Sequence, residues 1–122
     1  MRRWHFEHLV AEALDELPRR FRRRLRNIVV VVEQEPSREL LEDMGLWPDG
    51  TLLGLYQGVP LPQRGRSYGN VLPDRITIFQ KPIEAMCRTR REIKEAVKDT
   101  VMHEIGHYFG LDDERLEELM ED

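Results

Sequence analysis

One long amphipathic helix is the feature that most constrains the fold of this chain. Apolar residues recur at every fourth position over residues 90–109, which predicts one buried helical face. The stripe consists of Ile93, Val97, Val101 and Ile105. Thr89 with Glu92 three residues later predicts a capping box at its start, and Gly110 suits a left-handed residue at its end. Twenty residues span about 30 Å at 1.5 Å per residue, so the rest of a small domain must pack around this helix.

The other patterns predict a small sheet and further helices. Apolar periodicity predicts a helix over residues 3–17, and β-branched or alternating runs predict strands at 28–32, 51–57 and 75–80. A short helix or loop is expected at 36–50, a long loop at 58–74, and helices at 82–87 and 113–121. These elements predict an α+β fold: a small mixed sheet packed on the long helix, with N- and C-terminal helices.

Length and composition favour one domain over residues 1–122. The chain has 122 residues, of which 40% are apolar and 34% are charged, enough for one modest core. Its one cysteine, Cys87, excludes an internal disulfide. The N-terminus has no signal-peptide pattern, and no segment approaches the length of a membrane span. A soluble cytoplasmic protein is therefore expected.

The string TVMHEIGHYFGLDDE, residues 100–114, falls at the end of the long helix. His103 and His107 are four residues apart, so they share one helical face and can reach a single metal ion. Imidazole suits Zn²⁺, and a catalytic zinc usually has three protein ligands. Glu104 is placed to act as a general base on water. The pattern predicts a catalytic zinc site.

The third ligand is expected among the acids that follow Gly110. The full string H-E-x-x-H-x-x-G-x-x-D resembles the extended zinc-peptidase motif, whose last histidine falls on Asp113. A carboxylate oxygen is an acceptable zinc ligand, so Asp113 is predicted, with Asp112 and Glu114 as neighbouring alternatives. His5 and His8 also lie close together on a predicted helix, but they lack a matching third group.

Three segments carry a resemblance to a known family. LLGLYQG (52–58), RITIFQKPIE (75–84) and TVMHEIGHYFGLDD (100–113) look like the small bacterial zincin-like metallopeptidases. The resemblance implies a minimal zincin domain with a zinc-dependent peptidase site. A peptide substrate is then expected along an edge strand, for which 51–57 is the candidate. Only nine residues follow Asp113, which leaves little room for the methionine turn of the larger metzincins.

Two alternatives to a peptidase remain open. The bacterial rRNA-maturation endoribonucleases carry the similar pattern H-G-x-x-H-x-x-G-x-D-H, but here Glu104 replaces its glycine and Asp113 its last histidine. The six arginines of residues 19–26 keep a nucleic-acid partner in consideration. The second alternative is a zinc-binding module without turnover, because every ligand can be present while the groove is blocked.

Overall fold

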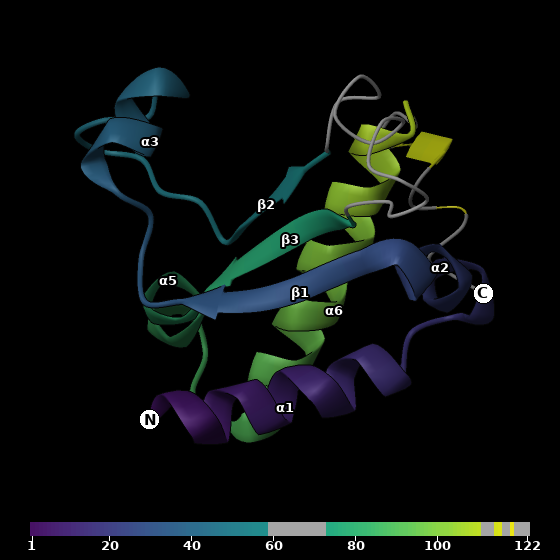
Figure 1. The fold of residues 1–122 in the computed structure, drawn as a ribbon. Helices are drawn as coiled ribbons and strands as arrows, with labels where there is room; N and C mark the ends of the chain where they lie inside the picture. The colour runs from purple at the N-terminus through teal and green to yellow at the C-terminus, as the bar shows by residue number, and fades with distance from the viewer. Residues whose placement is uncertain (59–72, 111–113, 116–117, 119–122) are drawn as a thin grey trace.

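The computed structural model describes residues 1–58, 73–110, 114–115 and 118, and these residues form a mixed α+β fold (Figure 1). The elements are α1 (Arg3–Asp15), α2 (Arg19–Arg24), the 3-10 turn η1 (Leu25–Asn27), β1 (Ile28–Glu33), α3 (Arg38–Asp43), β2 (Gly54–Gln57), β3 (Asp74–Phe79), α5 (Gln80–Met86) and α6 (Arg90–Tyr108). The predicted fold class is confirmed.

The three strands form one mixed sheet in the order β1-β3-β2. β1 pairs parallel to β3, with Val32 opposite Ile78, and β2 pairs antiparallel to β3, with Gly54 opposite the same Ile78. The β-branched run of β1 suits a strand, and β3 is its neighbour in this sheet. Among the described residues, β2 therefore lies at one edge of the sheet.

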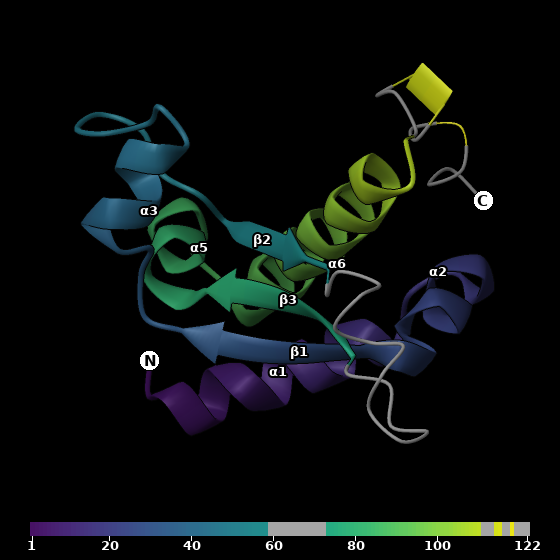
Figure 2. The same cartoon turned by 45° about the horizontal axis from the view of Figure 1, so that its top comes forward.

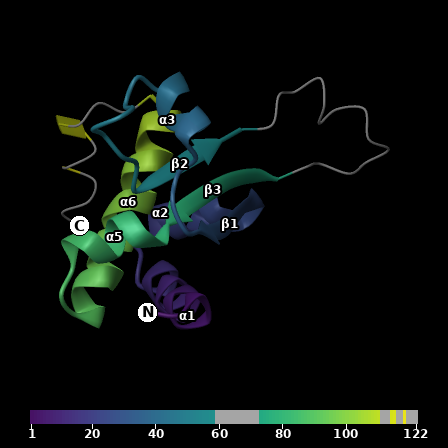
Figure 3. The same cartoon turned by 90° about the vertical axis from the view of Figure 1, so that its left-hand side faces the viewer.

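One face of the sheet is covered by helices. Ile76 and Ile78 are both 0% exposed, and their partners in β2, Tyr56 and Gly54, lie on the same face because cross-strand partners share a face. Figure 3 shows α6 on one side of the sheet, and Figure 1 shows α1 crossing α6 near its first turns. α6 therefore packs against β2 and β3.

The apolar stripe of α6 packs as its spacing predicts. Val97 and Val101 are 0% exposed and join the core cluster with Phe6 and Ala13 of α1. Each fully buried large apolar side chain contributes about 1.5–3 kcal/mol relative to exposure. These contacts fix the position of the helix that carries the histidines.

Both ends of α6 are defined as expected. The Thr89 hydroxyl accepts from the Glu92 N–H at 3.1 Å, and the Glu92 carboxylate accepts from the Thr89 N–H at 3.0 Å, which completes the capping box. Gly110 has φ of 79°, a conformation that glycine adopts without strain. The chain therefore leaves the helix just beyond Tyr108.

Several boundaries differ from the predictions. α2 occupies part of the arginine run, for which no element was predicted; the buried side chain of Phe21, 3% exposed, anchors it. β2 begins at Gly54 rather than at residue 51. Most of the expected 58–74 loop and of the 113–121 helix lies outside the described residues. In the described part of the chain, no helix is long and apolar enough to cross a membrane.

Candidate metal centre

The two histidines lie on one face of α6, as their spacing predicts. The rings of His103 and His107 have centroids 5.9 Å apart and meet edge to face at 68°. Two imidazoles that share one zinc, with N–Zn distances of about 2.0–2.1 Å, have ring centres at most about 6.5 Å apart. The observed separation is therefore compatible with one shared metal ion.

A backbone hydrogen bond sets the tautomer of His103. Its Nδ1 lies 2.8 Å from the carbonyl oxygen of Asp99 one turn earlier. A carbonyl can only accept, so Nδ1 carries a proton, and in the neutral ring the lone pair for a metal is then on Nε2. His107 lies in the last turn of α6, where the helix dipole favours a cation. Both features suit a metal site at this end of the helix.

Glu104 extends from α6 to the edge of the sheet. Its Oε1 accepts a hydrogen bond of 2.9 Å from the backbone N–H of Tyr56 in β2. Successive residues of an antiparallel strand direct their N–H groups alternately toward and away from the partner strand. The Tyr56 N–H points away from β3, toward the free edge of β2. The glutamate of the motif therefore lies at the sheet edge that sequence analysis selected for a peptide.

The side chain of Tyr56 connects β2 to β3 and to the last turn of α6. Its hydroxyl donates to Oδ2 of Asp74 at 2.6 Å, and Asp74 is buried, at 7% exposure. Its ring stacks on Tyr108 with centroids 4.0 Å apart and an interplanar angle of 18°. A buried carboxylate requires such a partner. These contacts hold β2 against the last turn of α6.

Gly54 allows β2 to approach α6 closely. A Cβ at this position would lie 2.6 Å from the Cγ2 of Thr100 and 3.0 Å from the backbone oxygen of Thr77. Both distances are shorter than normal van der Waals contact. The close neighbour of Gly54 is therefore Thr100 of α6, the helix that carries the two histidines.

A cavity of about 640 Å³ opens beside His103 and follows α6 toward α5. Its lining includes Leu53, Cys87, Asp99, Thr100 and His103. Burial raises the pKa of the Cys87 thiol, and nearby Glu92 raises it further, so the thiol stays protonated at neutral pH. Burial likewise raises the pKa of Asp99, while the charge of His103 opposes this rise.

The predicted third ligand cannot be placed. Asp113 and its neighbour Asp112 lie outside the described residues, whereas Glu114 is helical and exposed. Within the described ranges, no group of three His, Cys, Asp or Glu side chains is arranged to hold a metal ion. The structure thus brings His103 and His107 together, and the rest of the ligand set stays a prediction.

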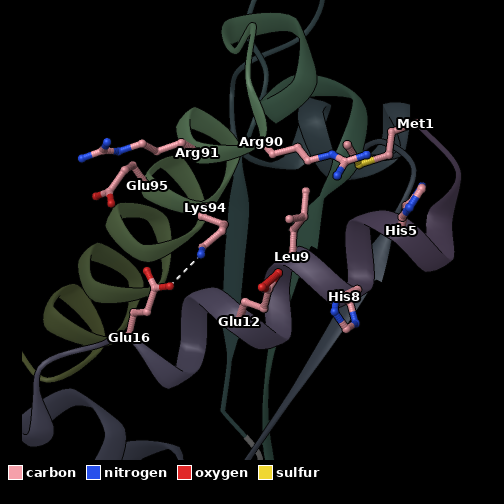
Figure 4. Close-up of a pocket in the computed structure, with 10 residues that line it drawn as sticks. All are labelled: Met1, His5, His8, Leu9, Glu12, Glu16, Arg90, Arg91, Lys94 and Glu95. Carbon is pink, nitrogen blue, oxygen red and sulfur yellow. Dashed lines mark ion pairs between the residues drawn. The ribbon is translucent and has the colours of Figure 1, made fainter.

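A second cavity, of about 690 Å³, lies between α1 and the first turns of α6 (Figure 4). His5 and His8 line it from α1, so they are placed near the opposite end of α6 from His107. Beside this cavity, Glu16 forms an ion pair of 2.6 Å with Lys94 of α6, drawn as a dashed line in Figure 4. The lining mixes acids and bases, which is typical of a solvated helix contact.

Comparison with known proteins identifies the family of this chain. The family model for zincin-like metallopeptidases matches residues 25–121, which is most of the chain. The chain therefore belongs to the zincin-like metallopeptidase family. Membership indicates a zinc-dependent peptidase, and the donor set fits it: two imidazoles on one helix suit zinc better than magnesium or calcium, which prefer oxygen ligands.

A solved structure supports the fold independently. It is described as a conserved hypothetical protein from Thermo thermophilus, and it matches with a TM-score of 0.53 at 21% sequence identity. The alignment covers 88% of this chain and 94% of that chain. No curated protein is significantly similar in sequence.

Proposed function

We propose that this protein is a zinc-dependent peptidase in which His103, His107 and Asp113 hold the metal and Glu104 is the general base. The observation that carries the proposal is the hydrogen bond of 2.9 Å between the Tyr56 N–H and the Glu104 carboxylate. Glu104, the proposed base, therefore lies beside the outer edge of β2. A peptidase of this kind needs both features within reach of one scissile bond.

The substrate binds in an extended conformation along β2. The alternation of an antiparallel strand directs the backbone groups of Gly54 and Tyr56 outward. The Tyr56 N–H is bonded to Glu104, so a peptide would pair with the Gly54 N–H and with the carbonyl oxygens of Gly54 and Tyr56. A peptide added there runs past Glu104 and His103. The cavity beside His103, lined by Leu53 and Thr100 among others, receives one substrate side chain.

The chemistry divides between the metal and Glu104. Zinc, when bound, activates a water molecule and polarises the scissile carbonyl. Glu104 accepts the proton of that water as the oxygen attacks the carbonyl carbon, and it then donates the proton to the leaving amine. The Tyr56 N–H holds the carboxylate at the edge of β2, and the Asp99 carbonyl accepts from Nδ1 of His103, which leaves Nε2 to bind metal.

One substrate panel tests the proposal against its alternatives. Zinc-loaded protein is incubated with an unfolded protein, a peptide library and structured RNA, and the products are identified by mass spectrometry and by gel electrophoresis. We expect cleavage of polypeptide alone, and its loss in His103→Ala. Cleavage of the RNA, dependent on His103, would favour the endoribonuclease; zinc binding without any cleavage would favour the module without turnover.

The third ligand has its own test. Asp113→Ala should weaken zinc retention far more than Asp112→Ala, because the register of the motif assigns the ligand to Asp113. Zinc remaining after dialysis against a weak chelator measures the difference. A larger loss in Asp112→Ala shifts the ligand by one residue and leaves the peptidase proposal in place.

A further inference from the structure

The arginines of residues 19–26 are held close to the candidate metal centre. Phe21 is 3% exposed and packs into the core, so α2 is fixed while its charged side chains face solvent. Figure 2 shows α2 on the same side of the molecule as the C-terminal end of α6. The exposed arginines, here called the arginine face, are Arg19, Arg20, Arg22, Arg23, Arg24 and Arg26.

A continuous series of contacts joins the arginine face to Glu104. The guanidinium of Arg24 lies 4.3 Å from the ring centroid of Phe109, and Phe109 meets Tyr108 edge to face at 5.2 Å. Tyr108 stacks on Tyr56 at 4.0 Å, and the Tyr56 N–H donates to Glu104. Phe109 is 45% exposed and Tyr108 49% exposed, so this line of contacts borders solvent.

The arginine face is a local excess of positive charge on an acidic protein. The whole chain has a formal net charge of −4. Among the residues that the structure describes, no carboxylate lies within ion-pair distance of Arg22 or Arg23. Clustered like charges repel one another, and each guanidinium can form a bidentate pair with a carboxylate. Arg22 and Arg23 are therefore suited to bind the carboxylates of an acidic ligand.

We propose that the arginine face binds an acidic segment of the polypeptide substrate while a neighbouring segment lies along β2. This rests on the proposed peptidase function and specifies its substrate class: polypeptides with a run of Asp or Glu near the cleaved bond. A nucleic acid is disfavoured by one observation: Arg24 already covers one side of the Phe109 ring, which limits the stacking of a base on that ring.

A binding measurement tests the assignment without requiring turnover. Zinc-loaded Glu104→Gln protein is titrated into a fluorescein-labelled peptide that contains six glutamates, and into the same peptide with six glutamines. We expect the glutamate peptide to bind at least about tenfold more tightly, as two charge-assisted contacts would give. Its affinity should fall as salt rises, and Arg22→Glu/Arg23→Glu should abolish the difference.

The matched control reverses two arginines at the other end of α6. Arg88 and Arg90 are exposed, and Arg88→Glu/Arg90→Glu makes the same change in net charge far from the arginine face. It should keep most of the preference for the glutamate peptide. If Arg22→Glu/Arg23→Glu fails to fold by circular dichroism, Arg22→Gln/Arg23→Gln replaces it, with the same expected direction.

Three results would overturn the assignment. They are equal binding of the two peptides, equal losses in the two double variants, and tighter binding of single-stranded RNA of matched charge through Arg22 and Arg23. Failure of the peptidase proposal has a different signature, because wild-type protein would then cleave no polypeptide while the binding preference in Glu104→Gln stayed intact.

Discussion

The two halves of α6 have different surroundings. The first half begins with a complete capping box, buries Ile93 and Val97, and is tied to α1 by ion pairs from Glu16 to Lys94 and Lys98. The last two turns carry two histidines, a glutamate bonded to an edge strand and an exposed Tyr108. The first half of α6 thus serves the packing of the core, and its last turns carry the side chains of the candidate site.

This difference distinguishes residues that the stability of the fold explains from residues that we assign to the proposed function. Apolar burial, capping and the ion pairs with Glu16 explain each side chain named in the first half. Two histidines on one partly exposed face contribute little to helix stability, since histidine has a modest helix propensity. Residues that local stability does not explain are expected at functional sites. The following substitutions test that division, from the largest expected effect to the smallest.

Ile93→Ala should affect the first half of α6 strongly. The side chain is 6% exposed, and its truncation should lower the free energy of unfolding by about 2–5 kcal/mol, measured by urea denaturation of metal-free protein. His107→Ala should lower it far less, because the ring is exposed, yet it should remove bound zinc. Equal destabilisation by both variants would contradict the proposed difference between the two halves of α6.

Gly54→Ala should disturb the contact between the sheet edge and α6. The new Cβ would lie 2.6 Å from the Cγ2 of Thr100, so the free energy of unfolding should fall by about 1–3 kcal/mol through overpacking. Thr100→Ser removes that methyl and keeps the hydroxyl that donates to the Ala96 carbonyl. The double variant should therefore recover part of the loss; no recovery would mean that Thr100 does not limit the approach.

Of these substitutions, Glu16→Gln should lower the stability least, and it should do so only within a limited pH range. Hydrogen bonds from Lys94 and then Lys98 lower the pKa of Glu16 below its ordinary value of 4.5, and Glu16 raises the pKa of Lys94 above 10.5. The ion pair therefore contributes fully between these ordinary values. Its contribution is lost as pH falls through the lowered pKa of Glu16 or rises through the raised pKa of Lys94.

Thermal unfolding of wild type and Glu16→Gln across pH measures this window. The two melting temperatures should differ near neutrality and converge in acid, where Glu16 is protonated and resembles glutamine. Asp15→Asn removes the same charge from the neighbouring exposed position and serves as the control. A wild-type advantage that persists below the lowered pKa of Glu16 would exclude the ion pair as its source.

Local sequence patterns predicted the fold correctly where interactions between residues close in sequence determine the structure. The capping box of Thr89 and Glu92 and the apolar stripe of α6 are local signals, and both were confirmed. α2 was missed because its six arginines dominate the pattern, although Phe21 is the residue that fixes it. β2 was predicted too long, because the point at which a strand leaves its partner depends on tertiary contacts.

The shared face of the two histidines was predictable from the sequence, whereas the surroundings of the candidate site were not. His103 and His107 share a face because of helical spacing alone. The bond between Tyr56 and Glu104 depends on the register of β2 against β3 and on how closely Gly54 lets β2 approach α6. No local pattern encodes that register. The stacking of Tyr56 on Tyr108 and the contact of Arg24 with Phe109 are tertiary for the same reason.

The central claim is that the last turns of α6 perform hydrolysis, with Glu104 acting on water rather than holding metal. The most direct measurement compares wild type with Glu104→Gln, which keeps the size of the side chain and removes the base. Zinc content by elemental analysis, expected at about one per chain, and the melting temperature should stay nearly unchanged. The rate of peptide cleavage should fall by about 10²-fold or more. Cleavage by Glu104→Gln at the wild-type rate would contradict the account, even with zinc fully bound.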